Sequence, residues 1–204
     1  MKAAPVQKRA QLKRQLLIDA ARDSFAEDGY EYTTAKRIAA RAGVATGTFY
    51  QHFDNKDDAL CILAERWFEA LDTRIERAAP LGTDSAGDDT QAGATKALFA
   101  RTLALLFETH EQGPELHQIF EQRRGLYAQL DAIMQRGEAL MHGHVLRYVQ
   151  SFNVRDPQTT AFTLYAMAEG LVHQFVFSET ALDRDRVIEQ GAAMLAAYFD
   201  ALSA

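Results

Sequence analysis

The sequence predicts an all-α protein, and three observations support this prediction. Apolar residues recur every three or four positions along most of the 204 residues, which is the period of an amphipathic helix. Helix start and stop residues, such as threonine or asparagine N-caps and glycine C-caps, divide the chain into segments of helical length. No segment shows the strict apolar and polar alternation that indicates a strand. The chain is long enough to bury a sizeable core as one domain or two small ones.

The first two predicted helices each end at a glycine. The first covers 10–27, and Gly29 follows it at the position where a left-handed C-cap residue is favoured. Thr33 or Thr34 offers a hydroxyl N-cap for the second helix, which ends at Gly43. We therefore expect a tight turn after the second helix.

The third and fourth predicted helices complete the N-terminal region. The third covers 46–52, and the fourth begins at Asn55, with Asp58 three residues later as in a capping box. The apolar pattern of the fourth helix continues far along the chain. We expect this long helix to connect a three-helix domain over 1–55 to a helical bundle over 56–204.

The rest of the chain predicts a loop and five more helices. Residues 80–93 are small, polar and acidic, which is typical of a loop. Pro114 follows Gly113 and Pro157 follows Asp156, and both prolines suit a first helical turn. The five predicted helices cover 94–111, 114–122, 126–152, 158–178 and 184–202.

The last two predicted helices are apolar on more than one face. A helix of this kind is buried on both sides, and at the end of a chain of this size the second side predicts another subunit. Small residues such as Gly191 and Ala192 permit close helix approach. We expect a homodimer in which two helices of each chain form a four-helix interface.

Composition excludes some classes of protein and is uneven along the chain. No apolar run reaches the ~20 residues that cross a bilayer, and no apolar signal core follows the basic N-terminus. Cys61 is the only cysteine, which suits a reducing cytosol. The net charge is −6, yet residues 1–56 contain ten Lys/Arg and six Asp/Glu. We expect a cytoplasmic protein whose basic N-terminal region suits nucleic-acid phosphates.

The segment 33–56, TTAKRIAARAGVATGTFYQHFDNK, carries the functional prediction. Two short helices joined by a glycine-containing turn form a helix-turn-helix unit, whose second helix enters the DNA major groove. Over residues 12–62 the chain closely resembles the N-terminal domain of tetracycline-repressor-like (TetR/AcrR-type) bacterial regulators. The resemblance rests on Ala20-Ala21, Phe25, Gly29-Tyr30, Thr33-Thr34, Ile38-Ala39, Ala42-Gly43-Val44, Gly47-Thr48, Tyr50, His52-Phe53, Lys56 and Leu60.

The resemblance implies a function and a set of partners. Members of this family are all-α homodimers whose N-terminal helices bind a palindromic operator in double-stranded DNA. Their C-terminal helices hold a small-molecule pocket and the dimer interface, and ligand binding releases the DNA. One departure is visible, because Ala45 stands where the family often has a serine N-cap. Loss of that cap costs ~1 kcal/mol unless Thr46 replaces it.

The resemblance also assigns roles to the helix-turn-helix residues. Tyr50, His52 and Lys56 match positions that contact backbone phosphates, which set register without reading sequence. The hydroxyls of Thr34 and Thr48 suit further phosphate contacts. The positions nearer the base edges are Lys36, Thr46, Gly47 and Gln51.

The base-edge residues have the chemistry for that role. Lysine pairs with guanine acceptors, glutamine with adenine, and a threonine methyl with the thymine methyl. Gly47 lets the backbone approach the groove closely. Arg37 and Arg41 are interpreted as general electrostatic contributors or solvated charges.

Aromatic and polar residues in the middle helices predict an effector pocket, although most such residues pack in cores. The candidates are Trp67, Phe99, Leu103, Phe107, Phe120, Tyr127, Leu130, Met134, Tyr165, Glu169 and His173. The Arg123-Arg124 pair suits either a ligand carboxylate or a solvated turn. The effector itself is expected to be apolar or amphipathic.

Other classes of protein are alternatives to a regulator. The alternative is a helical metabolite-binding or enzymatic protein with a structural helix-turn-helix, or a small helical cofactor protein. The sequence has no Gly-rich phosphate loop, no H-E-x-x-H and no G-x-S-x-G motif. Glu169 and His173 are interpreted as pairing with each other, or with a polar group of a ligand, rather than as an acid–base pair. The histidine pairs His142/His144 and His110/His117 lack metal-ligand spacing. We therefore predict no enzyme, no cofactor and no metal site.

Overall fold

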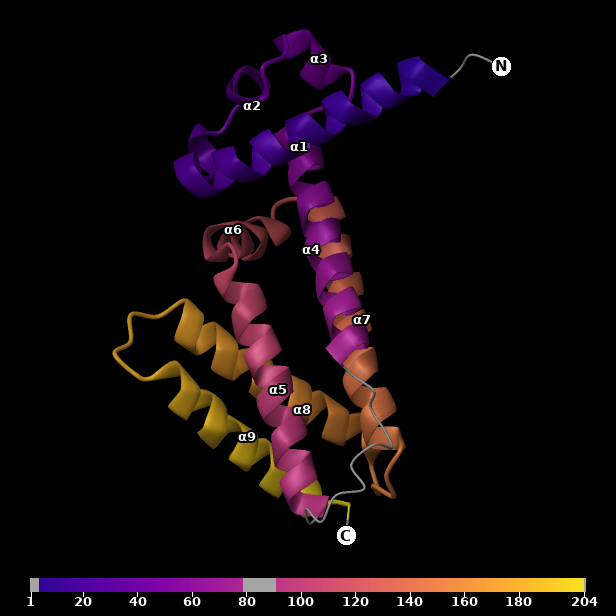
Figure 1. Cartoon of the computed structure of the whole chain (residues 1–204), viewed down its shortest axis with the longest axis vertical. Coiled ribbons are helices and arrows are strands. Elements are labelled where there is room, and N and C mark those ends of the chain that lie inside the picture. The colour runs from indigo at the N-terminus through magenta and orange to yellow at the C-terminus, as the bar shows by residue number, and fades with distance from the viewer. Residues whose placement is uncertain (1–3, 79–90, 204) are drawn as a thin grey trace. The chain divides into compact units, whose positions relative to one another are not determined.

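The computed structural model describes residues 4–78 and 91–203, and all regular structure in these residues is helical (Figure 1). This confirms the predicted all-α class. The helices are α1 (Ala4–Tyr32), α2 (Ala35–Arg41), α3 (Thr46–Tyr50), α4 (Lys56–Ala78), α5 (Gln91–Glu111), α6 (Pro114–Arg124), α7 (Ala128–Gln150), α8 (Pro157–Val176) and α9 (Arg184–Asp200).

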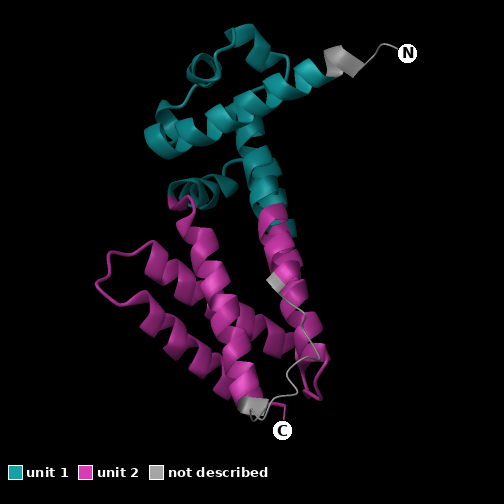
Figure 2. Ribbon diagram, in the orientation of Figure 1, with its two compact units in different colours: residues 1–68, 115–136 teal, residues 69–114, 137–204 magenta. Residues whose placement is uncertain are grey.

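The chain forms two compact units (Figure 2). Unit 1 contains residues 1–68 and 115–136, and unit 2 contains residues 69–114 and 137–204. α4 and α7 therefore each contribute to both units, and the chain also passes between them where α5 is followed by α6. The functional division into 1–55 and 56–204 stays a prediction.

Unit 1 is built around a small apolar core under the helix-turn-helix. The side chains of Leu17, Phe25, Ile38 and Phe49 are completely buried. They come from α1, α2 and α3, so each helix of the predicted three-helix domain contributes an apolar side chain to this core. α2 packs against both α1 and α3, and this packing positions the motif.

The end of α1 differs from the expectation. The helix continues to Tyr32 with a kink at Gly29, whose backbone angles are φ 75° and ψ 169°. This is not the left-handed helical C-cap that we expected, but a region that only glycine adopts readily. Gly29 therefore redirects the chain so that the last residues of α1 can reach α4.

Thr33 and Thr34 have different structural roles. Thr34 is the N-cap of α2, and its hydroxyl oxygen accepts from the backbone N–H of Arg37 at 3.2 Å. Thr33 is buried instead, and its hydroxyl lies 3.0 Å from the Ser24 carbonyl oxygen and 2.8 Å from that of Gly29. The first threonine therefore anchors the turn, and the second starts the helix.

The caps of the next two helices follow the local sequence. The Asn55 side chain accepts from the N–H groups of Asp57 and Asp58, and the Asp58 carboxylate accepts from the Asn55 N–H at 3.3 Å. This is the expected capping box. Ala45 is the N-cap of α3 and makes no side-chain cap bond, so the start of α3 lacks this stabilisation.

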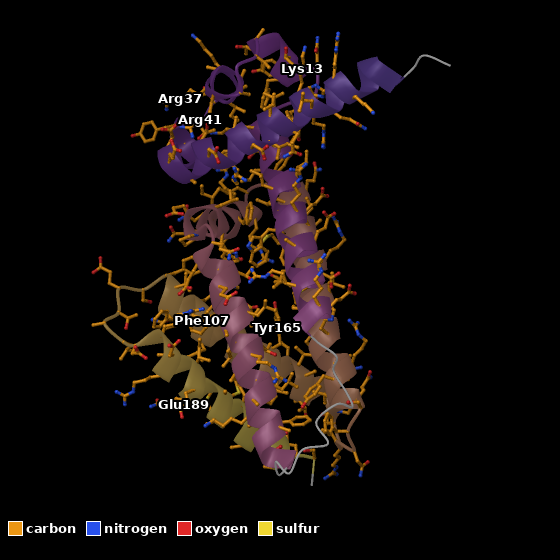
Figure 3. All side chains as sticks on the ribbon, in the orientation of Figure 1. Lys13, Arg37, Arg41, Phe107, Tyr165 and Glu189 are labelled. Atoms are coloured by element: carbon orange, nitrogen blue, oxygen red, sulfur yellow. The ribbon has the colours of Figure 1, made fainter. Side chains whose placement is uncertain are left out.

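Unit 2 is a helical bundle in which α5 packs against α8 and α9, and α8 packs against α9. Leu103, Phe107, Leu195 and Phe199 are buried in its core, and Figure 3 labels Phe107 in this bundle. Gly191 makes the close packing possible, because a Cβ atom there would lie 2.4 Å from a terminal methyl of Leu171.

The predicted helices of unit 2 are found with shifted ends. Pro157 is in the first turn of α8, where Asp156 caps the helix through the N–H of Thr159. Of the predicted loop over 80–93, residues 80–90 lie outside the described residues. Residues 91–93 are helical, so α5 begins earlier than expected. No helix of the described ranges is both long and apolar enough to cross a membrane.

The cysteine is a core residue of α4. Cys61 is 2 % exposed, and burial together with the nearby carboxylates, Asp58 foremost, raises the pKa of its thiol to about 12. Since the thiolate is the reactive form, we expect native protein at pH 8 to react with a disulfide reagent more than about a hundredfold more slowly than protein unfolded in urea. Rapid labelling of the native protein would instead favour a redox-sensing role.

Candidate nucleic-acid interface and candidate ligand pocket

The turn between α2 and α3 gives the helix-turn-helix its shape. The N–H of Gly43 donates to the Ala40 carbonyl at 3.1 Å, and that of Val44 donates to the Ala39 carbonyl at 3.0 Å. Gly43 adopts φ 68°, a left-handed angle that glycine tolerates without a Cβ penalty. Phe49 is fully buried and anchors α3, so the neighbouring positions of α3 face outward.

The residues assigned to base edges are accessible on this surface. Lys36, Gly47 and Gln51 are exposed, and Thr46 is half-buried. The position where a Cβ would stand on Gly47 has no heavy atom within 4 Å. The backbone at the start of α3 is therefore open to close approach by a partner.

The residues assigned to phosphates have different surroundings. Tyr50 is 59 % exposed, with its ring edge-on to Phe49 at 5.4 Å. His52 and Thr48 are half-buried. The Thr34 oxygen already caps α2, so only its hydroxyl proton remains available for a phosphate.

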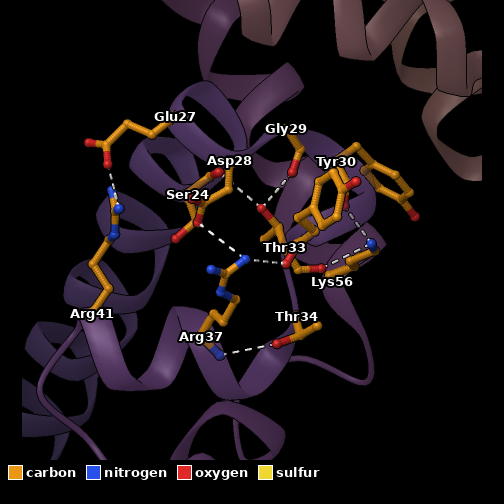
Figure 4. A network of polar contacts seen from close by, with 11 residues as sticks. Ser24, Glu27, Asp28, Gly29, Tyr30, Thr33, Thr34, Arg37, Arg41 and Lys56 are labelled. Atoms are coloured by element: carbon orange, nitrogen blue, oxygen red, sulfur yellow. Dashed lines mark hydrogen bonds and ion pairs between the residues drawn. The ribbon is translucent and has the colours of Figure 1, made fainter.

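Lys56 is held by the end of α1. Its ammonium donates to the carbonyl oxygens of Tyr30 at 2.6 Å and Thr33 at 3.0 Å (Figure 4). It also lies 3.8 Å from the centre of the Tyr30 ring. Burial lowers the pKa of Lys56, with neighbouring Glu31 opposing that change. An ammonium has three N–H donors, so two carbonyl bonds leave one donor for a phosphate.

Arg37 and Arg41 form contacts within the protein that the sequence did not indicate. Arg37 donates to the Tyr32 carbonyl at 3.0 Å and lies 3.8 Å from the Asp28 carboxylate. Arg41 forms an ion pair with Glu27 (Figure 4). These arginines join α2 to α1, and their charge is partly balanced within the protein.

Within unit 1, α6 and the residues after it contact α1 and α4, which the sequence did not indicate. The Arg123 guanidinium donates to the Tyr30 hydroxyl at 3.0 Å, lies 4.0 Å from the ring centre and is 3.8 Å from Asp57. The Tyr127 hydroxyl donates to Asp58 at 3.0 Å. Arg123 and Tyr30 are 93 positions apart, so no local pattern indicates this pairing.

Unit 2 contains a cavity of about 110 Å³. Four predicted pocket residues line it: Phe99, Leu103, Tyr165 and Glu169. Its other walls are mostly aliphatic, and its polar groups include Arg101, Thr102, His144 and Tyr148. An apolar cavity with a few polar groups is the usual form of a small-molecule site.

A buried histidine that sequence reasoning did not include borders this cavity. His144 contacts the Asp72 carboxylate through Nε2, and its Nδ1 lies 2.8 Å from the Arg147 guanidinium. Because arginine only donates, Nδ1 accepts and Nε2–H donates to Asp72. Burial raises the pKa of neighbouring Tyr148 to about 12, so its hydroxyl is a neutral donor and acceptor near pH 7.

The other predicted pocket residues are elsewhere. Phe107 is fully buried in unit 2 and does not line this cavity. Trp67, Phe120, Tyr127, Leu130 and Met134 belong to unit 1. Phe120, Leu130 and Met134 are buried there.

His173 pairs with Glu169 on α8, with Nε2 3.4 Å from a carboxylate oxygen. His110 of α5 approaches the same oxygen at 3.7 Å. Burial lowers the pKa of His110, and the Glu169 carboxylate opposes this with a smaller effect. The expected internal pair is therefore a three-residue cluster.

Comparison with known proteins identifies both parts of the chain. The family model described as "Bacterial regulatory proteins, tetR family" matches residues 17–60. The model described as "Tetracyclin repressor-like, C-terminal domain" matches residues 96–199, which is half of the chain. The chain belongs to the tetR family.

Two bacterial regulators are similar to this tetR-family protein over about a third of its length. The fatty acid metabolism regulator protein of Bacillus subtilis (strain 168) is 45 % identical over 61 residues, 30 % of each chain. The HTH-type transcriptional repressor KstR of Mycolicibacterium smegmatis is 36 % identical over 70 residues, 34 % of each chain. The matches thus span about a third of the length of these relatives.

A solved structure agrees with the fold over nearly the whole chain. A tetR-family transcriptional regulator from Mesorhizobium loti MAFF303099 has a TM-score of 0.77 and 20 % identity, covering 95 % of this chain and 97 % of that chain. This likeness establishes the fold. The tetR-family assignment confirms the expectation drawn from the 33–56 segment, whereas the individual site residues stay predictions.

Proposed function

We propose that this tetR-family protein is a ligand-responsive transcriptional repressor in the cytoplasm. It binds a palindromic operator as a homodimer and is released by an apolar or amphipathic small molecule. The observation that carries the proposal is the helix-turn-helix with Lys36, Gly47, Tyr50 and Gln51 on its open surface. A buried structural motif would not leave these side chains accessible.

The dimer is proposed to form through α8 and α9. Phe162, Leu182 and Met194 are 65 %, 68 % and 46 % exposed in the single chain. A groove between these helices is lined by Leu171 and Phe175, among others. A second chain would cover this apolar surface. To meet successive major grooves of one operator, the two α3 helices of the dimer are expected to lie about 34–36 Å apart, one turn of DNA.

The cavity in unit 2 supports the proposed effector class. Leu103, Leu164 and Leu195 contribute apolar walls, while Tyr165 and Glu169 contribute polar atoms. Such a lining favours a largely apolar molecule with one or two hydrogen-bonding groups. A chemically broad screen in which no compound raises the melting temperature would count against this effector site.

The test is a titration of the purified protein against the DNA upstream of its own gene, with a scrambled duplex at the same salt. We expect selective binding by two chains per duplex. Absence of binding to either duplex at low salt would favour the alternative of a helical metabolite-binding protein or enzyme with a structural helix-turn-helix.

Gln51→Ala tests whether Gln51 contacts a base edge in the operator. We expect it to lose discrimination at one base pair per half-site, worth about 1–3 kcal/mol, and to leave binding to scrambled DNA unchanged. The measurement is fluorescence anisotropy with operators substituted one base pair at a time. The matched control is Gln150→Ala, an exposed glutamine at the end of α7. If Gln51→Ala weakens every duplex equally, Gln51 does not read a base.

A further inference from the structure

Three potential metal ligands converge in unit 2. His110 of α5 and Glu169 and His173 of α8 all belong to this unit, and α5 packs against α8. The Nε2 atoms of His110 and His173 lie 3.7 Å and 3.4 Å from the same Glu169 oxygen. The two imidazoles also offer nitrogen atoms within 4.8 Å of one another. Two imidazole nitrogens therefore approach one carboxylate oxygen.

The tautomer of His110 suits coordination. Its Nδ1 lies 2.8 Å from the Leu106 carbonyl oxygen. A carbonyl oxygen only accepts, so Nδ1 carries the hydrogen, and in the neutral ring Nε2 keeps its lone pair, 3.7 Å from the Glu169 oxygen. Metal-binding histidines are commonly oriented by such a bond from the other ring N–H to a backbone carbonyl.

The spacing of the ligand atoms suits a tetrahedral ion. Zinc binds nitrogen and oxygen at about 2.0–2.2 Å, so two ligands of a tetrahedral site lie about 3.3–3.6 Å apart. The nitrogen-to-oxygen distances of 3.4 Å and 3.7 Å are already close to this range.

We propose that His110, Glu169 and His173 bind a divalent first-row transition-metal ion, such as Zn²⁺ or Co²⁺. Two imidazoles and one carboxylate suit these ions, whereas Mg²⁺ and Ca²⁺ prefer oxygen ligands. This proposal departs from the expectation of no metal site, which considered the spacing of histidine pairs along the chain. Three protein ligands leave a fourth position for water or another donor.

The test is a titration of untagged, chelator-treated protein with Co²⁺, followed by its ligand-field absorbance and by displacement with Zn²⁺. We expect one ion per chain. Glu169→Gln and His173→Gln each remove or weaken one ligand. Loss of an outer-shell partner alone typically lowers metal affinity by about 10- to 100-fold, so we expect each of these variants to lower the Co²⁺ affinity by more than that. Circular dichroism checks that each variant remains folded.

The matched control is His142→Gln, which changes a half-buried histidine of unit 2 outside the cluster. We expect it to retain the Co²⁺ affinity of the native protein. The proposal is overturned if the native protein shows no stoichiometric Co²⁺ spectrum. It is also overturned if folded Glu169→Gln and His173→Gln proteins bind as tightly as His142→Gln. Metal binding is measured without DNA, so its outcome is independent of the proposed repressor function.

Discussion

Phe107→Ala should lower the free energy of unfolding by about 3–5 kcal/mol, the usual loss when a buried phenylalanine is truncated. The Phe107 ring is completely buried and meets the Phe175 ring edge-on, with the ring centres 5.1 Å apart. The Arg184 guanidinium lies 5.7 Å from the ring centre. Removing the ring therefore loses apolar burial and two specific contacts, and leaves a void.

Urea unfolding monitored by circular dichroism measures this effect. The control is Leu126→Ala, which removes an apolar side chain that is 71 % exposed and should change stability by no more than about 0.5 kcal/mol. A Phe107→Ala protein as stable as the control would show that the ring is not part of the core. In that case the predicted ligand-binding role of Phe107 would regain support.

Lys56→Met should weaken DNA binding and also destabilise unit 1. The substitution leaves the carbonyl groups of Tyr30 and Thr33 without their donor, and an unsatisfied buried polar group costs about 1–3 kcal/mol. If the third N–H of Lys56 contacts a phosphate, the slope of log affinity against log salt should also fall by about 0.9. We expect the weaker binding and the smaller salt slope with both specific and scrambled DNA.

The two roles of Lys56 are separable by measurement. Urea unfolding reports the loss of the carbonyl bonds, and a salt series of anisotropy titrations reports the phosphate contact. Lys36→Met is the matched control for the unfolding measurement, since Lys36 is exposed on α2 and its substitution should leave stability within about 0.5 kcal/mol of the native protein. A destabilised Lys56→Met protein with an unchanged salt slope would refute the phosphate role and keep the structural one.

The sequence was sufficient to predict the elements whose causes are local. The capping box of Asn55 and Asp58, the turn at Gly43 and the start of α8 at Pro157 each depend on residues within a few positions of one another. The helical periodicity of the apolar residues predicted the all-α class for the same reason. The same short segment over 33–56 indicated the tetR family, because its motif has fixed spacing.

Only the tertiary structure decided which distant side chains meet. It placed Arg123 against Tyr30, and His110 beside Glu169 and His173. It also separated the predicted pocket residues, so that Leu103, Tyr165 and Glu169 share a cavity while Phe107 is part of the core. Helical periodicity tells which residues face inward, but it does not tell which helix they face. Which helices pack together depends on contacts between residues far apart in the sequence, and local sequence patterns do not predict those contacts.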